Sequence, residues 1–342
     1  MFTAVKVKKI DVALLLVCLA LFKMEALPIM AKNGIQILSL IGAFCILGIN
    51  YKIRINDISF IIIIPIVISS VISYLSGIIS IQNVFNCFFY MMALFEFSNI
   101  VWIYSKDNSL EMFKTMKQIF AIFFIMNLIS IFIIGTEDTG NTTYLFGGKF
   151  ISVYLAFFSI LLSFSTKEEE VGLPKLLVSC GLLSLFSIYF SCSTGIILAM
   201  ALFLSLIIPT YIKKFLCNGK TVLIIVILTA LLVFSIESII NIPLISNFIT
   251  GTLNRNLTLS GRLPIYKYYL IPLILKKPIL GYGYGSSILH VTTPYWNAQN
   301  GLLDYQLNYG ICGSCSILLL FWLVARSYKN KFWYIKRIRR II

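Results

Sequence analysis

The sequence predicts an all-α, polytopic integral membrane protein. Hydrophobic residues make up 59% of the 342 residues and charged residues only 12%, a balance that lies outside the range of soluble globular domains. A helix that crosses a bilayer needs about 20 apolar residues, and apolar runs of this length recur along most of the chain. Long apolar runs and scarce charge together predict a bundle of transmembrane helices.

By this criterion the chain contains about ten spans, nine of them within residues 1–240. Their approximate limits are 10–30, 34–50, 58–77, 83–104, 118–135, 149–165, 175–191, 193–211, 221–240 and, for the last, 302–325. A large extracytoplasmic loop with short interfacial helices is expected over 241–301, and a basic cytoplasmic tail over 326–342. The first apolar run precedes no small-residue cleavage site, so it is expected to be retained as a span.

Basic residues predict how the bundle is oriented. Lys and Arg number 28 against 13 acidic residues, which gives a formal net charge of +15. In a membrane protein such an excess marks the cytoplasmic connections, so nucleic acid is not an expected partner. With both termini cytoplasmic, these connections carry Lys52, Arg54, Lys106, Lys114, Lys117, Lys167, Lys175, Lys213, Lys214 and Lys220. The connection at 136–141, on the opposite side, is acidic.

Two cysteines, Cys312 and Cys315, have the C-x-x-C spacing of redox and zinc motifs. A redox motif requires a strand-to-helix context, and a zinc site requires further ligands. Neither is evident in the sequence, so packing of small residues at a helix start is the preferred interpretation. No metal and no cofactor are predicted.

The segment 241–301 is where the sequence predicts the active site. It is rich in glycine, tyrosine and arginine and has no clean spanning run, and irregular backbone survives at a membrane only within protein or a wet cavity. A bound anion such as a lipid-linked phosphate would balance its charge, and the alternative is a loop solvated by anionic headgroups. Its cations, with no acid between Glu237 and Asp304, are Arg255, Arg262, Lys267, Lys276 and Lys277.

Local patterns predict two structures within this segment. Ser260 and Pro264 indicate the start of a short interfacial helix that ends before Pro278. Its N-terminus bears Arg262 and suits a phosphate. The alternating glycines and tyrosines of 281–285 predict a tight re-entrant turn that brings backbone close to a ligand or a helix. They do not predict a dinucleotide loop, because no strand precedes them.

Three motifs of this region occur in order. Ser260-Gly-Arg262 opens the short helix, Pro278-Ile-Leu-Gly-Tyr-Gly-Tyr-Gly285 follows it, and Gln299-Asn300 leads to Gly310-Ile-Cys-Gly313. In these motifs the chain resembles the O-antigen polymerase and ligase family of bacterial surface-polysaccharide assembly, integral membrane glycosyltransferases of the Wzy and WaaL type. The resemblance covers about the last hundred residues, with weaker likeness at 191–195 and 146–149.

The resemblance implies a polymerase of the bacterial inner membrane that builds the O-antigen of lipopolysaccharide or a capsule. Its substrate would be a polyprenyl-pyrophosphate-linked oligosaccharide, whose glycan is transferred to the non-reducing end of another lipid-linked repeat unit. Its other partners would be the lipid bilayer and further assembly proteins, a flippase and a chain-length regulator. Because no metal cluster is evident, cations would stabilise the charge that develops on the pyrophosphate, and the enzyme would be metal-independent.

The candidate residues follow from these chemical demands. Arg255 and Arg262 would clamp the pyrophosphate with Lys267 behind them, since the planar guanidinium matches phosphate oxygens. Gln299 and Asn300 would hydrogen-bond sugar hydroxyls of the acceptor. His290 is the candidate base, as the one histidine of the chain. The remaining substrate-binding candidates, most of them faces for sugar rings, are Tyr282, Tyr284, Tyr295, Trp296 and Lys149.

Two positions depart from the family pattern, and other functions remain open. Gln299 stands where the family usually has a histidine, and Thr194 stands where ligases commonly have an arginine. Both departures weaken the alternative of an O-antigen ligase. A flippase of the same lipid-linked sugar would favour internal repeats and charged or broken spans, whereas no two halves of this chain look alike. A scaffold without chemistry would leave the cationic loop unexplained.

Overall fold

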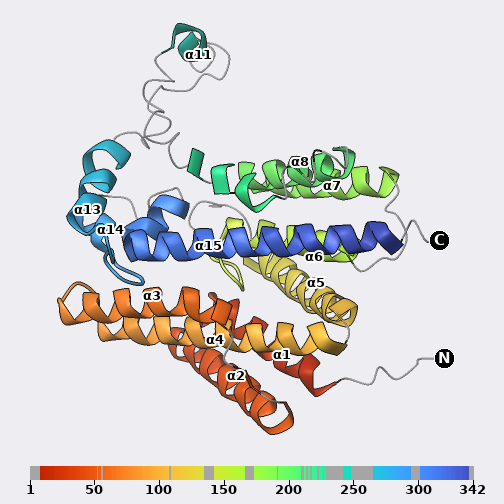
Figure 1. Ribbon diagram of the computed structural model, residues 1–342, viewed down its shortest axis with the longest axis horizontal. Coiled ribbons are helices and arrows are strands. Elements are labelled where there is room, and N and C mark those ends of the chain that lie inside the picture. The colour runs from red at the N-terminus through yellow and green to blue at the C-terminus, as the bar shows by residue number, and fades with distance from the viewer. Residues whose placement is uncertain are drawn as a thin grey trace. The chain divides into compact units, whose positions relative to one another are not determined.

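The computed structural model describes a helical protein (Figure 1). It describes residues 8–51, 53–54, 57–107, 109–134, 142–165, 173–190, 192–208, 212, 215, 218–221, 223–225, 227–228, 242–247, 265–293 and 301–338. These residues contain no β-strand, apart from an isolated bridge between Tyr144 and Gly147. The prediction of an all-α fold is therefore confirmed for the part of the chain that is described.

The helices differ widely in length. The long ones are α1 (Lys9–Leu21), α2 (Ile29–Asn50), α3 (Asp57–Leu75), α4 (Ile81–Asp107), α5 (Ser109–Ile134), α6 (Lys149–Ser165), α7 (Leu173–Tyr189), α8 (Ser193–Ile207) and α15 (Gly301–Ile338). The short ones are α11 (Pro243–Asn247), the π-helix η2 (Ile265–Leu270), α13 (Ile271–Lys276) and α14 (Ile288–Thr292).

Among the described residues, four helices are long and apolar enough to cross a membrane, with spanning segments at Ile29–Asn50, Ile81–Lys106, Leu110–Ile134 and Gly301–Leu323. Four shorter apolar helices lie at Ser59–Leu75, Lys149–Phe164, Pro174–Tyr189 and Ser193–Leu204. Each of these eight overlaps a span that the sequence predicts. The chain is thus a multi-pass membrane protein, and the count of about ten spans stays a prediction, because most of 221–240 lies outside the described residues.

The first predicted span, 10–30, is shorter in the structure. Helix α1 ends at Leu21 after 13 residues, fewer than the about 20 that a bilayer requires. Polar residues follow its end, since Lys23 and Glu25 lie in the connection to α2, and Pro28 is the N-cap of α2. Glu25 of this connection pairs with Lys32 of α2, and the Nζ of Lys32 lies 2.5 Å from the Glu25 carboxylate oxygen.

The chain forms two compact units, one of Met1–Asn56 and Phe89–Ile208, the other of Asp57–Phe88 and Pro209–Ile342. In the first unit, apolar side chains of α1, α2, α4, α5 and α6 form one buried cluster, and those of α5 to α8 form a second. Close helix crossings use small residues. A Cβ on Gly195 of α8 would overlap Ser187 of α7, so only glycine fits there.

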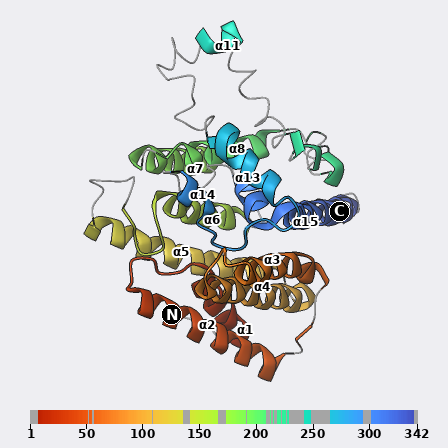
Figure 2. The ribbon, with the colours of Figure 1, turned by 90° about the vertical axis from the view of Figure 1, so that its left-hand side faces the viewer.

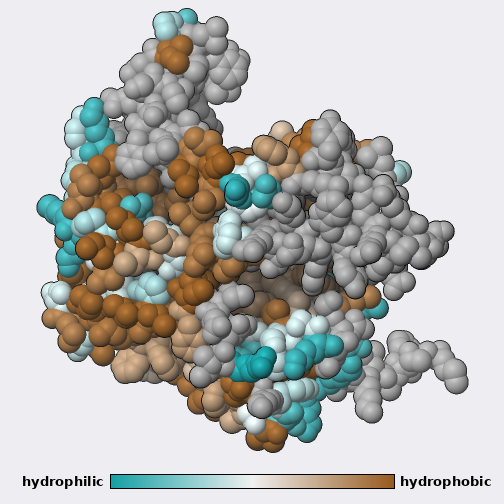
Figure 3. Space-filling view, viewed as in Figure 1, coloured by the Kyte–Doolittle hydropathy of each residue, from teal (hydrophilic) through white to brown (hydrophobic). Residues whose placement is uncertain are grey.

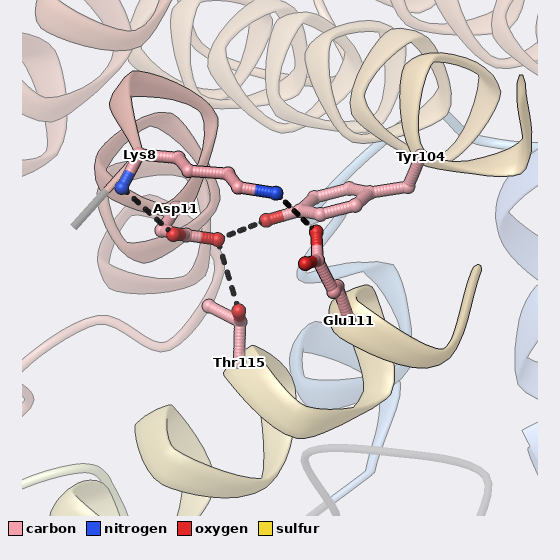
Figure 4. A network of polar contacts seen from close by, with 5 residues as sticks. All are labelled: Lys8, Asp11, Tyr104, Glu111 and Thr115. Carbon is pink, nitrogen blue, oxygen red and sulfur yellow. Dashed lines mark hydrogen bonds and ion pairs between the residues drawn. The ribbon is translucent and has the colours of Figure 1, made fainter. Parts of the chain in front are cut away.

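A network of polar side chains joins three helix ends of the first unit (Figure 4). Asp11 of α1 accepts hydrogen bonds from Tyr104 of α4 and from Thr115 of α5. Lys8 pairs with Glu111 at the start of α5. The network places the beginning of α1, the end of α4 and the beginning of α5 on the same side of this unit.

In the second unit α3 packs beside α15 (Figures 1 and 2). A buried apolar cluster joins η2, α13, α14 and the first turns of α15. Helix α15 continues to Ile338, into the segment that the sequence predicts as a cytoplasmic tail.

Large apolar side chains cover much of the visible surface (Figure 3). Met30, Leu38, Phe132 and Ile133 each have at least 71% of their surface exposed. A soluble protein rarely exposes such extended apolar area. We interpret this apolar surface as the part of the protein that contacts lipid.

Candidate active site

Helix α15 is broken at Gly310. The backbone there has φ 61° and ψ −160°, which is non-helical and lies in a region that favours glycine. A Cβ at this position would also overlap the backbone of Ile279. The break divides α15 into a short first segment of residues 301–309 and a long second segment of residues 311–338.

The loop Pro278–Gly285 supplies the hydrogen bonds that the broken helix lacks. Before the break, the carbonyl oxygens of Leu307 and Asn308 accept from the N–H groups of Tyr282 and Gly283, at 3.0 and 2.8 Å. After it, the N–H groups of Ile311 and Cys312 donate to the carbonyl oxygens of Pro278 and Ile279, at 2.8 and 3.1 Å. Backbone groups left without partners at membrane depth are costly. The loop therefore allows α15 to remain broken.

The glycines of this loop are required by close approach to two helices. Gly281 and Gly283 have φ of 67° and 84°. A Cβ on Gly281 would lie 2.5 Å from the carbonyl carbon of Asn308, and one on Gly283 would lie 2.8 Å from the Cβ of Ser73 in α3. The glycine-rich turn predicted from the sequence thus brings backbone against α15 and α3.

Polar side chains of α3 and α4 hold the other face of the loop. The hydroxyl of Ser69 lies 2.5 Å from the carbonyl oxygen of Leu280 and 3.0 Å from that of Asn308. Ser70 Oγ accepts a hydrogen bond from the N–H of Tyr284 at 3.1 Å. Asn83, in the first turn of α4, donates to the carbonyl oxygen of Gly285 at 3.0 Å.

Sequence reasoning missed Ser69, Ser70 and Asn83 as contributors to this region. The available signal was a cluster of three serines, at positions 69, 70 and 73, in the second half of the apolar helix α3. Polar side chains that lie inside membrane helices commonly have a structural or functional partner. Nothing in the local sequence indicated that the partner lies more than two hundred residues away.

The chain between η2 and the loop changes its helical form at a proline. Residues Ile265–Leu270 are π-helical and Ile271–Lys276 are α-helical, with Pro272 at the start of the α-helical part. Proline lacks an N–H and its ring crowds the carbonyl of the preceding turn. A wider turn relieves that crowding, and π-helical turns are frequent at functional sites.

Tyr282 serves as an anchor of the loop. Its ring is 5% exposed within the apolar cluster, and its hydroxyl donates to the carbonyl oxygen of Leu273 at 3.1 Å. Burial raises the pKa of the Tyr282 phenol, so the phenol is neutral at physiological pH. In this structure Tyr282 packs within the apolar cluster, and its role in stacking a sugar ring stays a prediction.

The other described candidates lie in different environments. His290 is half-buried on α14, Lys267 is exposed on η2, and Tyr284 is half-buried on the loop. Lys149 belongs to the first unit, at the start of α6, with its Nζ 5.9 Å from the ring centroid of Phe150. The candidates outside the described residues are Arg255, Arg262, Tyr295, Trp296, Gln299 and Asn300.

Cys312 and Cys315 lie one turn apart in the second segment of α15 and are both free thiols. Among the described residues, no group of three or more His, Cys, Asp or Glu side chains is placed to hold a metal ion. The described residues of this region thus position other groups rather than bind a metal ion. They fix a backbone framework whose edges continue into the candidate segments around Arg262 and Asn300.

Comparison with known proteins gives one family match. Residues 180–318 match a family model described as O-antigen ligase. The match includes η2, α13, the loop Pro278–Gly285 and the break in α15, and it confirms the resemblance found in the sequence. No curated protein and no solved structure matches the chain.

Proposed function

We propose that this chain, whose residues 180–318 match the O-antigen ligase family, is a membrane polymerase of bacterial surface polysaccharide. An acceptor hydroxyl oxygen forms a bond with the anomeric carbon of a donor glycan. The bond from that carbon to the pyrophosphate breaks, and the pyrophosphate leaves on its polyprenyl chain. The proton of the hydroxyl passes to a nearby base or to water.

One observation carries the proposal. Ile265 and Leu303 are fully buried side chains of the same apolar cluster. Arg262 precedes the first by three residues, and Asn300 precedes the second by three. Three residues of extended chain span at most about 11 Å. These short links to one buried cluster support the proposal that the anion-binding candidate and the acceptor-binding candidate act at a common site.

The chemistry of these two groups supports glycosyl transfer. A guanidinium matches two oxygens of a phosphate, and a cation placed where charge develops lowers the barrier to departure of the pyrophosphate. An amide side chain can orient a sugar hydroxyl by donating and accepting hydrogen bonds. The guanidinium would assist departure of the pyrophosphate, and the amide would orient the attacking hydroxyl, so both groups would serve the same glycosyl transfer.

Extension of lipid-linked products tests this function. Purified protein in detergent is incubated with a lipid-pyrophosphate-linked repeat unit, and the products are separated by length. A ladder of longer lipid-linked products supports a polymerase. In a parallel reaction with added lipid A core, transfer to that acceptor alone indicates a ligase. After reconstitution into liposomes, movement of the substrate across the bilayer without a new bond indicates a flippase.

Removal of the anion clamp sharpens the test. We expect Arg262→Ala to lower the rate of chain growth by about 100-fold or more, because one charge-assisted contact to the transition state is lost. Arg262→Lys should recover little, since a point charge does not replace the planar fork. Lys114→Gln, which removes a charge from α5 in the first unit, is the matched control. Normal growth in Arg262→Ala at the wild-type protein level would reject the role.

A further inference from the structure

Two basic side chains share one tryptophan ring in the first unit. The guanidinium carbon of Arg54 lies 5.0 Å from the ring centroid of Trp102, and the Nζ of Lys106 lies 4.0 Å from it. The two charged groups are therefore at most 9.0 Å apart, the sum of these distances. Both side chains are exposed.

A buried side chain holds Arg54 at this place. Asn99 of α4 is 1% exposed, and its Oδ1 accepts a hydrogen bond from the N–H of Arg54 at 2.8 Å. Its Nδ2 donates to the carbonyl oxygen of Phe95 at 3.0 Å, which fixes the amide. The connection after α2 is thus attached to α4 through its backbone. The guanidinium is positioned over Trp102 independently of its own charge.

The two cations have no acidic partner among the side chains that the structure describes. Its ion pairs join Lys8 to Glu111 and Lys32 to Glu25. An aromatic face attracts a cation but carries no net charge. Two like charges held close together at an exposed position therefore favour an anion from outside the chain.

The position of this cluster identifies the source of the anion. The spanning segment of α4 ends at Lys106, and that of α2 ends at Asn50, four residues before Arg54. Tryptophan at the end of a spanning helix lies at the level of the lipid headgroups. The anion that is always present at this level is the phosphate of a phospholipid, and basic residues there attract anionic lipids.

We propose that Arg54, Trp102 and Lys106 form a binding site for the headgroup phosphate of an anionic phospholipid. The site lies outside the residues that match the family model. Arg54 and Lys106 contact the phosphate oxygens, and Trp102 holds both cations apart from bulk water on one face. The site selects anionic over zwitterionic lipid, because a zwitterionic headgroup brings its own cation.

Lipid binding to the purified, delipidated full-length protein tests the proposal. Mixed micelles of phosphatidylglycerol or of phosphatidylcholine are added, and bound lipid is counted by native mass spectrometry. We expect preferential retention of phosphatidylglycerol by the wild type. Arg54→Gln and Lys106→Gln should each weaken the affinity of the protein for phosphatidylglycerol by about fivefold. A basic residue near the membrane surface contributes about 1 kcal/mol to the binding of anionic lipid, which corresponds to that factor.

Further variants distinguish a specific lipid-binding site from attraction by the overall positive charge of the protein. Trp102→Leu keeps every charge but removes the ring, and we expect it to lose the preference as Arg54→Gln does, whereas Trp102→Phe should retain most of it. Lys114→Gln removes one exposed charge from the same end of the unit and should bind as the wild type. Unchanged thermal unfolding confirms that each variant is folded.

Three outcomes would overturn the proposal. The first is wild-type affinity for phosphatidylglycerol in Arg54→Gln, Lys106→Gln and Trp102→Leu. The second is an equal loss in Lys114→Gln, which would indicate attraction by net charge alone. The third is displacement of the lipid by inorganic phosphate at millimolar concentration, which would indicate a site for a free phosphate from water.

Discussion

The hydroxyl of Ser69 lies against two carbonyl oxygens from different segments, that of Leu280 in the loop and that of Asn308 in α15. A hydroxyl has one proton to donate, so it can serve one oxygen at a time and remains close to the other. Its position makes a residue of α3 part of the contact between loop and broken helix.

Replacement of Ser69 should weaken that contact. We expect Ser69→Ala to lower the free energy of unfolding by about 1–2 kcal/mol, because a buried carbonyl loses its donor, and to slow chain growth as well. Ser76→Ala is the control, since Ser76 is exposed in the turn after α3 and its hydroxyl donates to the nearby carbonyl oxygen of Ile72. Thermal unfolding and product length measure both effects. Equal behaviour of the two variants would contradict the role of Ser69.

The acceptor side of the reaction depends on His290, on Asn300 or on both. His290 lies on the five-residue helix α14, half-buried, outside the motifs that carry the family resemblance. If departure of the pyrophosphate limits the reaction, His290→Gln should be nearly silent, and Asn300→Ala should raise the KM for the acceptor. If His290 is the base, both His290→Gln and His290→Ala should lose kcat. We expect the first pattern, and a folded but inactive His290→Gln enzyme would reverse it.

At the scale of elements, the break in α15 is the feature on which the region depends. Helix α15 gives up regular bonding around Gly310 and gains four backbone hydrogen bonds from the loop Pro278–Gly285. The backbone groups on either side of Gly310 therefore keep hydrogen-bond partners, and the break costs little free energy as long as the loop Pro278–Gly285 packs against α15. Loop and break must therefore form together.

Substitution of Gly310 should prevent the loop Pro278–Gly285 and the break in α15 from forming together. We expect Gly310→Ala to reduce the amount of folded protein and to abolish chain growth, because this positive-φ, extended-ψ backbone is essentially restricted to glycine and costs another residue about 1–3 kcal/mol, and because the added Cβ overlaps Ile279. Gly34→Ala is the control: it lies inside α2 with nothing within 4 Å, and alanine should stabilise the helix by up to about 1 kcal/mol. Size-exclusion profiles and product length distinguish them. A folded, active Gly310→Ala protein would show that the break is dispensable.

The sequence predicts some of these elements and not others, for identifiable reasons. Apolar runs are local, so helical spans such as α5 and the turn at Gly281 could be anticipated from composition and glycine spacing. The contact of Ser69 with Leu280 is not local, and a serine in a membrane helix that bonds its own helix backbone has the same sequence as one that bonds a distant loop. The length of α1 was misjudged because the apolar count outweighed Lys23 and Glu25, the polar residues that follow the end of the helix at Leu21.

For the molecule as a whole, the polar contacts of the first unit bear on which side faces the cytoplasm. In the first unit, Lys9 donates to Asn50 at 2.7 Å, and Asp11 contacts Tyr104 and Thr115. The beginning of α1, the end of α2 and the connection from α4 to α5 thus lie on one side. This is the grouping that the distribution of basic residues requires, and by the positive-inside rule we predict that this side is cytoplasmic.

Cysteine labelling in intact cells tests this orientation. In a background that lacks the native cysteines, we expect Ser287→Cys to react with a membrane-impermeant reagent, since it is exposed beside the loop that we predict to face outward. Ser105→Cys, exposed near the end of α4, and Asn330→Cys, in the last part of α15, should react only after permeabilisation. The reverse pattern would put the candidate active site on the cytoplasmic side. A lipid-linked donor presented on the outer leaflet could not then reach Arg262, and the proposed polymerase reaction would have to be abandoned together with the topology.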